Sequence, residues 1–214
     1  MTENENTMKT GTTTLAIRCK DGIVLAADKR ATAGNLIANK FVDKIFTVED
    51  YMAITTAGTV SDVQLLLKLI TAEVRLKRLR SSRKVSVKEA ANLLAGMVYS
   101  NIRKFSTIPG ISHFIFAGKD DVGFQIYDIY PDGSIAEAND YVASGSGSVF
   151  AYGVLETLYK DTMSIDEGKS LAIKSLNAAL QRDSASGNGI DVMIITNDGA
   201  KKVLTRKLET GVKE

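Results

Sequence analysis

The chain has 214 residues, of which 44% are hydrophobic and 24% are charged, and its formal net charge is +2. This composition is typical of a globular protein with one substantial core, and the near-neutral charge gives no electrostatic reason to expect nucleic acid or a membrane surface as a partner. No apolar run approaches the ~20 residues that cross a bilayer, and a single cysteine and a single histidine argue against an internal disulfide and a histidine-rich metal site. We therefore expect no membrane segment, no metal, no other cofactor and a reducing, cytoplasmic compartment.

Strand patterns begin directly after a polar segment that ends at Gly11. Residues 1–10 contain no apolar run, which excludes the core of a secretory signal peptide, whereas the residues after Gly11 alternate like a strand. An Asp-Gly dipeptide separates the first two strand-like runs and predicts a hairpin. The two strand pairs predicted in this part of the chain span 13–19 with 23–27 and 41–48 with 51–56.

Four helices are predicted from apolar spacing and from capping signals. Apolar residues recur at helical spacing from Val60, and capping boxes formed by Ser86 with Glu89 and by Ser164 with Glu167 open two further helices. The predicted helices span about 60–79, 86–102, 149–160 and 164–181, and further strands are predicted at 114–118, 123–130, 190–196 and 201–206. This order favours an α+β fold in which two antiparallel sheets pack together between pairs of helices.

Thr12 is a candidate nucleophile that would need no histidine. If the chain were cut after Gly11, the new α-amino group of Thr12 would have a pKa of ~7.7–8.0 and could take the proton of the Thr12 hydroxyl near neutral pH. Glycine at position 11 would allow the contorted backbone that an attack on its own carbonyl requires. Taken alone the pattern is weak, and a frayed tail before an edge strand is the simpler interpretation.

Three further segments could complete a site around Thr12. Lys44 lies among apolar residues, so its ammonium could be buried next to a carboxylate. Asp28, at the end of an apolar strand, could supply that carboxylate. The segment 181–187 places hydroxyls and a carboxylate where a helix turns into a strand. The simpler alternatives are a surface lysine and an ordinary loop.

The remaining candidates have plainer explanations. Cys19 near a strand end is best explained as a core residue, and His113 has no Gly-x-Ser-x-Gly motif nearby that would suggest a catalytic triad. The loop 145–148 before a helix could hold an anion, but it fits neither the dinucleotide pattern nor the P-loop pattern. The basic run 75–84 falls at a predicted helix end, where cations complement the dipole, so a solvated end or a subunit contact is favoured over a nucleic-acid site.

Taken together, these segments resemble the β subunits of the 20S proteasome, which are N-terminal nucleophile hydrolases. The matching motifs run in the family's order and span nearly the whole chain after residue 11: Gly11-Thr-Thr-Thr14, Ala27-Asp-Lys-Arg30, Lys44, Thr56-Ala-Gly58, Gly145-Ser-Gly-Ser148 with Tyr152-Gly-Val-Leu155, and Arg182-Asp-Ser-Ala-Ser-Gly187. The short leader is similar to that of archaeal rather than bacterial subunits. The resemblance implies a four-layer αββα sandwich, which agrees with the predicted order of elements.

The resemblance also implies a role for each matching residue. Thr12 would be the nucleophile, Lys44 the positive charge that lowers the pKa of its hydroxyl, and Asp28 the carboxylate that pairs with Lys44. The backbone N–H of Gly58 would stabilise the oxyanion. The residues that would orient the Thr12 amine and a catalytic water are Ser146, Asp183 and Ser186.

A leader and a substrate pocket follow from the same resemblance. Residues 1–11 would form a propeptide that is released when Thr12 attacks the carbonyl of Gly11, and residues 12–214 would form one catalytic domain. An apolar preference for the residue before the cut is expected, because the pocket for it would be lined by Ala31, Val42, Thr56 and Val60.

The resemblance implies partners as well. Such β subunits would form a heptameric ring stacked on rings of α subunits, and a regulatory ATPase would deliver unfolded proteins to this threonine endopeptidase. Two alternatives stay open. The chain could be a structural β subunit whose intact site stays unprocessed, or an amidase of small molecules with the same fold.

Overall fold

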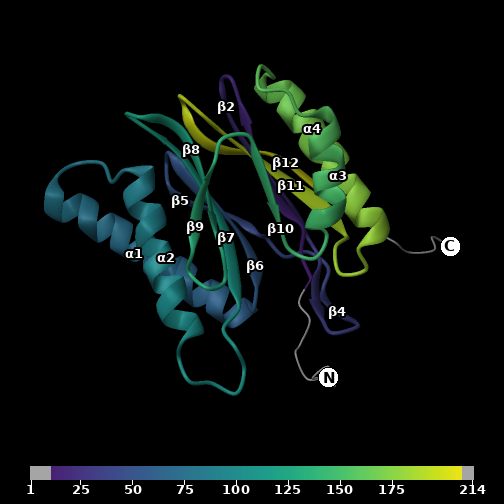
Figure 1. Ribbon diagram of the computed structural model, residues 1–214, viewed down its shortest axis with the longest axis horizontal. Coiled ribbons are helices and arrows are strands. Elements are labelled where there is room, and N and C mark those ends of the chain that lie inside the picture. Colours follow the sequence, from purple (N-terminus) through teal and green to yellow (C-terminus); the bar gives the residue numbers. More distant parts are fainter. Residues whose placement is uncertain (1–10, 209–214) are drawn as a thin grey trace.

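Two five-stranded antiparallel sheets lie face to face in the computed structural model, which describes residues 11–208 (Figure 1). In spatial order the first sheet contains β10 (Tyr141–Ser144), β1 (Thr14–Cys19), β2 (Gly22–Asp28), β11 (Gly189–Thr196) and β12 (Gly199–Lys207). The second sheet contains β5 (Ile45–Glu49), β6 (Met52–Gly58), β7 (Ser112–Asp120), β8 (Gly123–Ile129) and β9 (Ile135–Ala138). A separate short pair is formed by β3 (Ala31–Ala33) and β4 (Leu36–Asn39).

A pair of helices covers the outer face of each sheet (Figure 1). The pair on the second sheet is α1 (Val60–Ser81) with α2 (Val87–Ile102), and the pair on the first sheet is α3 (Ser148–Leu158) with α4 (Ile165–Arg182). The fold is therefore the αββα sandwich expected from the sequence. Within residues 11–208, no helix is both long enough and apolar enough to cross a membrane.

Alternation along β1 shows how the layers are held together. Leu15 and Ile17 pack against the cluster under α3 and α4, whereas Ala16 between them belongs to the cluster that separates the two sheets. Ala53 of β6 and Ala117 of β7 meet that same inner cluster from the second sheet. Both faces of β1 are therefore buried, and small side chains occupy part of the layer between the sheets.

The structure confirms the predicted order of elements, including both capping boxes. One boundary is wrong: the strand predicted from residue 41 begins at Ile45, because the N–H of Val42 donates to the carbonyl of Lys29 and the preceding residues run towards the end of β2. Sequence patterns also missed β3, β4, β9 and β10. Each has only three or four residues, too few to show a period.

Candidate active site

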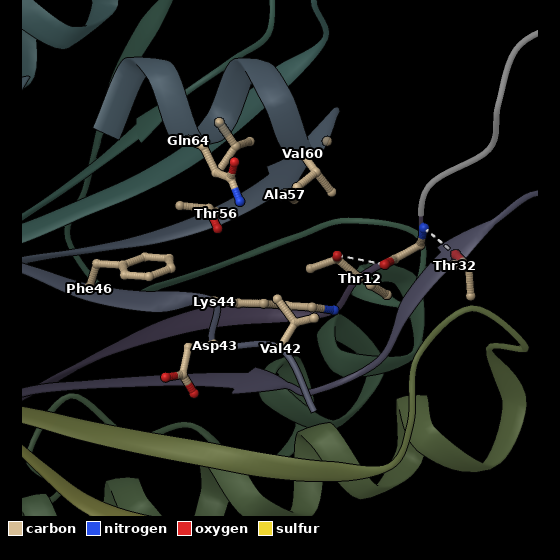
Figure 2. Close-up of a pocket in the computed structure, with 14 residues that line it drawn as sticks. Thr12, Thr32, Val42, Asp43, Lys44, Phe46, Thr56, Ala57, Val60 and Gln64 are labelled. Atoms are coloured by element: carbon tan, nitrogen blue, oxygen red, sulfur yellow. Dashed lines mark hydrogen bonds between the residues drawn. The ribbon is translucent and has the colours of Figure 1, made fainter. Parts of the chain in front are cut away.

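Thr12 lies just before β1 with its hydroxyl against the preceding carbonyl group. Thr12 Oγ1 donates a hydrogen bond of 2.6 Å to the carbonyl oxygen of Gly11 (Figure 2). The residue is buried, and its own carbonyl accepts a bond of 3.3 Å from the N–H of Gly147. The hydroxyl is therefore held beside the peptide bond that it would have to cleave.

Lys44 and Asp28 form a buried ion pair between the two sheets. Lys44 Nζ lies 2.6 Å from Asp28 Oδ1, and Figure 2 shows the Lys44 ammonium directed towards Thr12. Burial lowers the pKa of Lys44 below its ordinary value, and the charge of Asp28 offsets only part of this effect. Asp28 also accepts three backbone hydrogen bonds of 2.9–3.0 Å, from the N–H groups of Thr13, Arg30 and Gly187. The carboxylate is thus fixed through both of its oxygens.

A second chain of hydrogen bonds reaches the backbone nitrogen of Thr12. The Thr12 N–H donates to Ser146 Oγ at 3.3 Å, and the Ser146 hydroxyl donates to Asp183 Oδ2 at 2.7 Å. The same carboxylate oxygen accepts a bond of 2.6 Å from Ser186, whose Oγ lies 2.7 Å from Thr13 Oγ1. The structure therefore connects the three predicted orienting residues to one another and to Thr12. Thr13, which the sequence analysis did not select, joins this chain to Asp28 through its N–H.

The ends of secondary-structure elements place these groups. Ser146 precedes α3 and Asp183 follows α4, and the two helices pack side by side (Figure 1). Gly58 ends β6 with a φ of +121°, and a Cβ there would lie 2.2 Å from the carbonyl oxygen of Ile111. Only glycine fits this position.

A cavity of about 80 Å³ opens beside Thr12 and Lys44 (Figure 2). Its lining includes Gly58 and all four residues predicted for the pocket, namely Ala31, Val42, Thr56 and Val60. Phe46 and Gln64, which sequence patterns did not predict, line the same cavity. Their spacing could have revealed them, since Phe46 lies two residues after Lys44 on an extended segment and Gln64 lies four residues after Val60 on a helix.

Asp43 brings to the cavity a charge that the sequence analysis did not include. Its carboxylate lies 2.8 Å from Lys29 Nζ and 3.5 Å from Lys202 Nζ, so it is paired with cations outside the cavity lining. The lining is otherwise mostly apolar or hydroxyl-bearing, apart from Lys44 and Gln64. The chemistry of the cavity therefore suits an uncharged side chain.

The candidates that the sequence analysis set aside do not line this cavity. His113 Nε2 lies 2.6 Å from Asp128 Oδ1, so the histidine has a local partner. Cys19 is buried, and burial raises the pKa of its thiol to about 12. Within the described part of the chain, no group of three or more histidine, cysteine, aspartate or glutamate side chains is arranged to hold a metal ion.

The αββα sandwich defines this chain as having the N-terminal nucleophile hydrolase fold. A family model described as proteasome subunit matches residues 8–195, which is most of the chain. The chain therefore belongs to the proteasome subunit family. This membership agrees with the resemblance found in the sequence motifs.

Relatives named proteasome subunit beta are similar to the chain over most of its length. The relative from Methanothermobacter thermautotrophicus is 42% identical over 204 residues, which cover 95% of this chain and 94% of the relative. The relative from Methanococcus aeolicus is 44% identical and covers 93% of this chain and 90% of its own length. The relative from Archaeoglobus fulgidus is also 44% identical, with coverage of 88% and 86%. The similarity is thus to β subunits of archaea.

Proposed function

We propose that this chain is a proteasome β subunit that hydrolyses peptide bonds with Thr12 as its nucleophile, after self-cleavage has removed residues 1–11. One observation carries the proposal, the meeting of three groups at Thr12. Its hydroxyl contacts the Gly11 carbonyl, its nitrogen bonds to Ser146, and the Lys44–Asp28 pair shares its cavity. Similarity to archaeal proteins named proteasome subunit beta supports the same function. Most of the leader, residues 1–10, lies outside the described residues.

In the self-cleavage step, Thr12 Oγ1 bonds to the carbonyl carbon of Gly11, and the bond from that carbon to the Thr12 nitrogen breaks. Because this nitrogen is still an amide, it cannot take the hydroxyl proton. We assign that proton to Lys44, which shares the cavity with Thr12 and whose pKa is lowered by burial. The same proton then passes from Lys44 to the leaving nitrogen, so Lys44 ends the step as it began, while Ser146 Oγ, which accepts the N–H of Thr12 at 3.3 Å, holds that nitrogen in place. Water then hydrolyses the ester and leaves a carboxylate on Gly11 and a free hydroxyl and amine on Thr12.

Peptide hydrolysis uses the same hydroxyl on a substrate carbonyl. The free α-amino group of Thr12, with an ordinary pKa of ~7.7–8.0, takes the hydroxyl proton and returns it to the leaving amine. The N–H of Gly58 stabilises the oxyanion, a kind of contact worth about 3–4 kcal/mol of barrier elsewhere. The apolar side chains of Ala31, Val42 and Val60 favour an uncharged side chain before the cut.

Assembly with other proteasome subunits follows from membership of the family. We further propose that seven of these chains form a ring, that rings of α subunits flank it, and that an ATPase feeds unfolded proteins into the chamber. A cytoplasmic location belongs to the same proposal. A closed chamber would explain why a nonspecific peptidase does not damage folded proteins.

The intact mass of the chain isolated from its assembled particle tests the proposal, with Thr12→Ala as the control. We expect the wild-type chain to begin at Thr12 and to hydrolyse a blocked peptide, and the variant to keep its leader and to be inactive. A wild-type chain that keeps its leader in a complete particle would favour a structural subunit. A trimmed chain that hydrolyses small amides but no blocked peptide would favour an amidase.

A further inference from the structure

Gly11 is held on two sides by residues that the proposed mechanism does not use. Its backbone N–H donates a buried hydrogen bond of 2.8 Å to Thr32 Oγ1 (Figure 2). On another side lies Ala185, and a Cβ placed on Gly11 would lie only 1.7 Å from the Cβ of Ala185. Thr32 belongs to β3 and Ala185 to the loop after α4, so two distant segments meet at this one residue.

These contacts restrain Gly11, the residue whose carbonyl group Thr12 would attack. Thr32 fixes the nitrogen of Gly11, while Thr12 Oγ1 contacts its carbonyl oxygen. A glycine backbone is otherwise unusually free to rotate, and holding a reacting group in one orientation accelerates an intramolecular step. Ala185 is itself anchored, because its N–H donates to Asp183 Oδ1 at 3.1 Å.

We propose that Thr32 and Ala185 form a leader clamp, in which the Thr32 hydroxyl positions Gly11 for self-cleavage and the Ala185 side chain restricts position 11 to glycine. The proposal rests on the proposed function, because it takes cleavage after Gly11 as the reaction. In that reaction the Gly11 carbonyl carbon exchanges its bond to the Thr12 nitrogen for a bond to Thr12 Oγ1, and one proton moves from oxygen to nitrogen. Thr32 is a positioning residue and exchanges no atom.

Thr32→Val tests the hydroxyl, because valine keeps the shape of threonine. The full chain is assembled into its particle, and the release of residues 1–11 is followed by intact mass over time. Loss of one hydrogen bond should slow release about three- to tenfold, and Thr32→Ser, which keeps the hydroxyl, should recover most of the rate. Release by Thr32→Val at the wild-type rate would overturn the positioning role.

A chain made to begin at Thr12, by removal of a fused carrier protein, separates positioning of the leader from general damage. In this pre-trimmed form, Thr32→Val should reduce peptide hydrolysis by a smaller factor than it reduces release of the leader. Equal losses in both reactions would overturn a role specific to the leader. If the wild-type chain itself keeps its leader, the proposed function fails and the clamp fails with it. If the wild-type chain releases its leader and Thr32→Val releases it at the same rate, only the positioning role of Thr32 fails and the proposed function stands.

Exchanging side chains between positions 11 and 185 tests the second contact. Gly11→Ala should slow release roughly 10- to 100-fold, because the added methyl overlaps Ala185. Combining it with Ala185→Gly should recover part of that loss, since a Cβ on residue 11 would still lie 2.8 Å from the Cα of residue 185. Ala185→Gly alone should stay within about threefold of wild type. A double variant no faster than Gly11→Ala would overturn the restriction to glycine.

Discussion

Two lysine–aspartate clusters with buried lysines adjoin where residues 28–29 meet residues 43–44, and they differ in what surrounds the lysine. Asp28 pairs with Lys44 beside the cavity, whereas the neighbouring Lys29 contacts both Asp43 and Asp191. Successive residues of an extended chain point in opposite directions, which separates the two clusters although their residues adjoin in sequence.

The pKa values of the two lysines shift in opposite directions. Burial lowers the pKa of Lys44, and its single carboxylate partner does not reverse the shift. Burial would lower the pKa of Lys29 as well, but its hydrogen bonds to Asp191 at 2.6 Å and Asp43 at 2.8 Å outweigh it and raise the pKa. The second carboxylate therefore accounts for the difference between Lys29, whose pKa is raised, and Lys44, whose pKa is lowered.

The largest effect should come from Lys44→Met, which removes the lysine to which we assign the proton of self-cleavage. We expect leader release to fall by about 100-fold or more, because the proposed self-cleavage uses this group, and peptide hydrolysis to fall with it, because a chain that keeps its leader has no free amine on Thr12. Release is measured by intact mass and hydrolysis with a blocked peptide. Turnover close to that of wild type would remove Lys44 from the proposed mechanism.

Lys29→Met should act on stability rather than on chemistry. It leaves the carboxylate of Asp191 buried without its closest cation, although Lys202 Nζ at 3.7 Å and the Thr205 hydroxyl at 2.8 Å stay beside it. We therefore expect a loss of about 3 kcal/mol of unfolding free energy, the lower end for a broken buried pair. Lys44→Met should cost less, because Asp28 keeps three backbone N–H donors. Urea unfolding of the unassembled subunits measures both. A larger loss in Lys44→Met than in Lys29→Met would contradict the comparison.

The pH dependence of stability should differ in sign between the two lysines. Because the folded pKa of Lys29 lies above its ordinary value of 10.5, its stabilising contribution is complete below pH 10.5 and is lost as the pH rises further. The folded pKa of Lys44 lies below 10.5, so the unfolded chain binds more protons between the two values and stability rises with pH there. Urea unfolding of wild type and both variants between about pH 7 and 11 measures this. Parallel curves for the two variants would contradict the opposite shifts.

The smallest effect should come from Asp43→Asn, which removes the exposed partner of Lys29. The Asp43 side chain is 57% exposed, so water screens its pairing, and the expected loss of stability is about 1 kcal/mol or less. Peptide hydrolysis should stay within about twofold of wild type, because Lys29 keeps Asp191. A tenfold loss of hydrolysis would show that Asp43 acts on Lys44 or on substrate.

The fold could be predicted where turn or capping residues mark the ends of an element and a long hydrophobic periodicity marks its body. Asp21-Gly22 marks the turn of the first hairpin, and Ser86 with Glu89 marks the start of α2, because each satisfies backbone groups locally. The β3–β4 pair could not be predicted, since all residues of β4 are exposed and show no apolar alternation. Its position depends on tertiary contacts that the sequence pattern does not carry.

Residue patterns raised Thr12, Asp28 and Lys44 as candidates, but only the resemblance favoured them over simpler interpretations. Thr12 looks like part of a frayed tail and Lys44 like a surface lysine until the fold brings them to one cavity. Thr13, Thr32 and Ala185 were missed for the same reason, because each is a common residue whose importance comes from a partner far along the chain. Such long-range contacts leave no local period or motif to detect.

The groups around Thr12 come from both sheets, and the space between those sheets consequently sets the geometry of the proposed active site. Asp28 ends a strand of the first sheet, whereas Lys44 precedes one strand of the second sheet and Gly58 ends another. Alanines such as Ala16 and Ala53 act as spacers in the intervening layer. The thickness of that layer therefore helps to set the distance between the Thr12 hydroxyl and the Lys44 ammonium. In this way the alanine methyl groups influence the active site although they do not contact it.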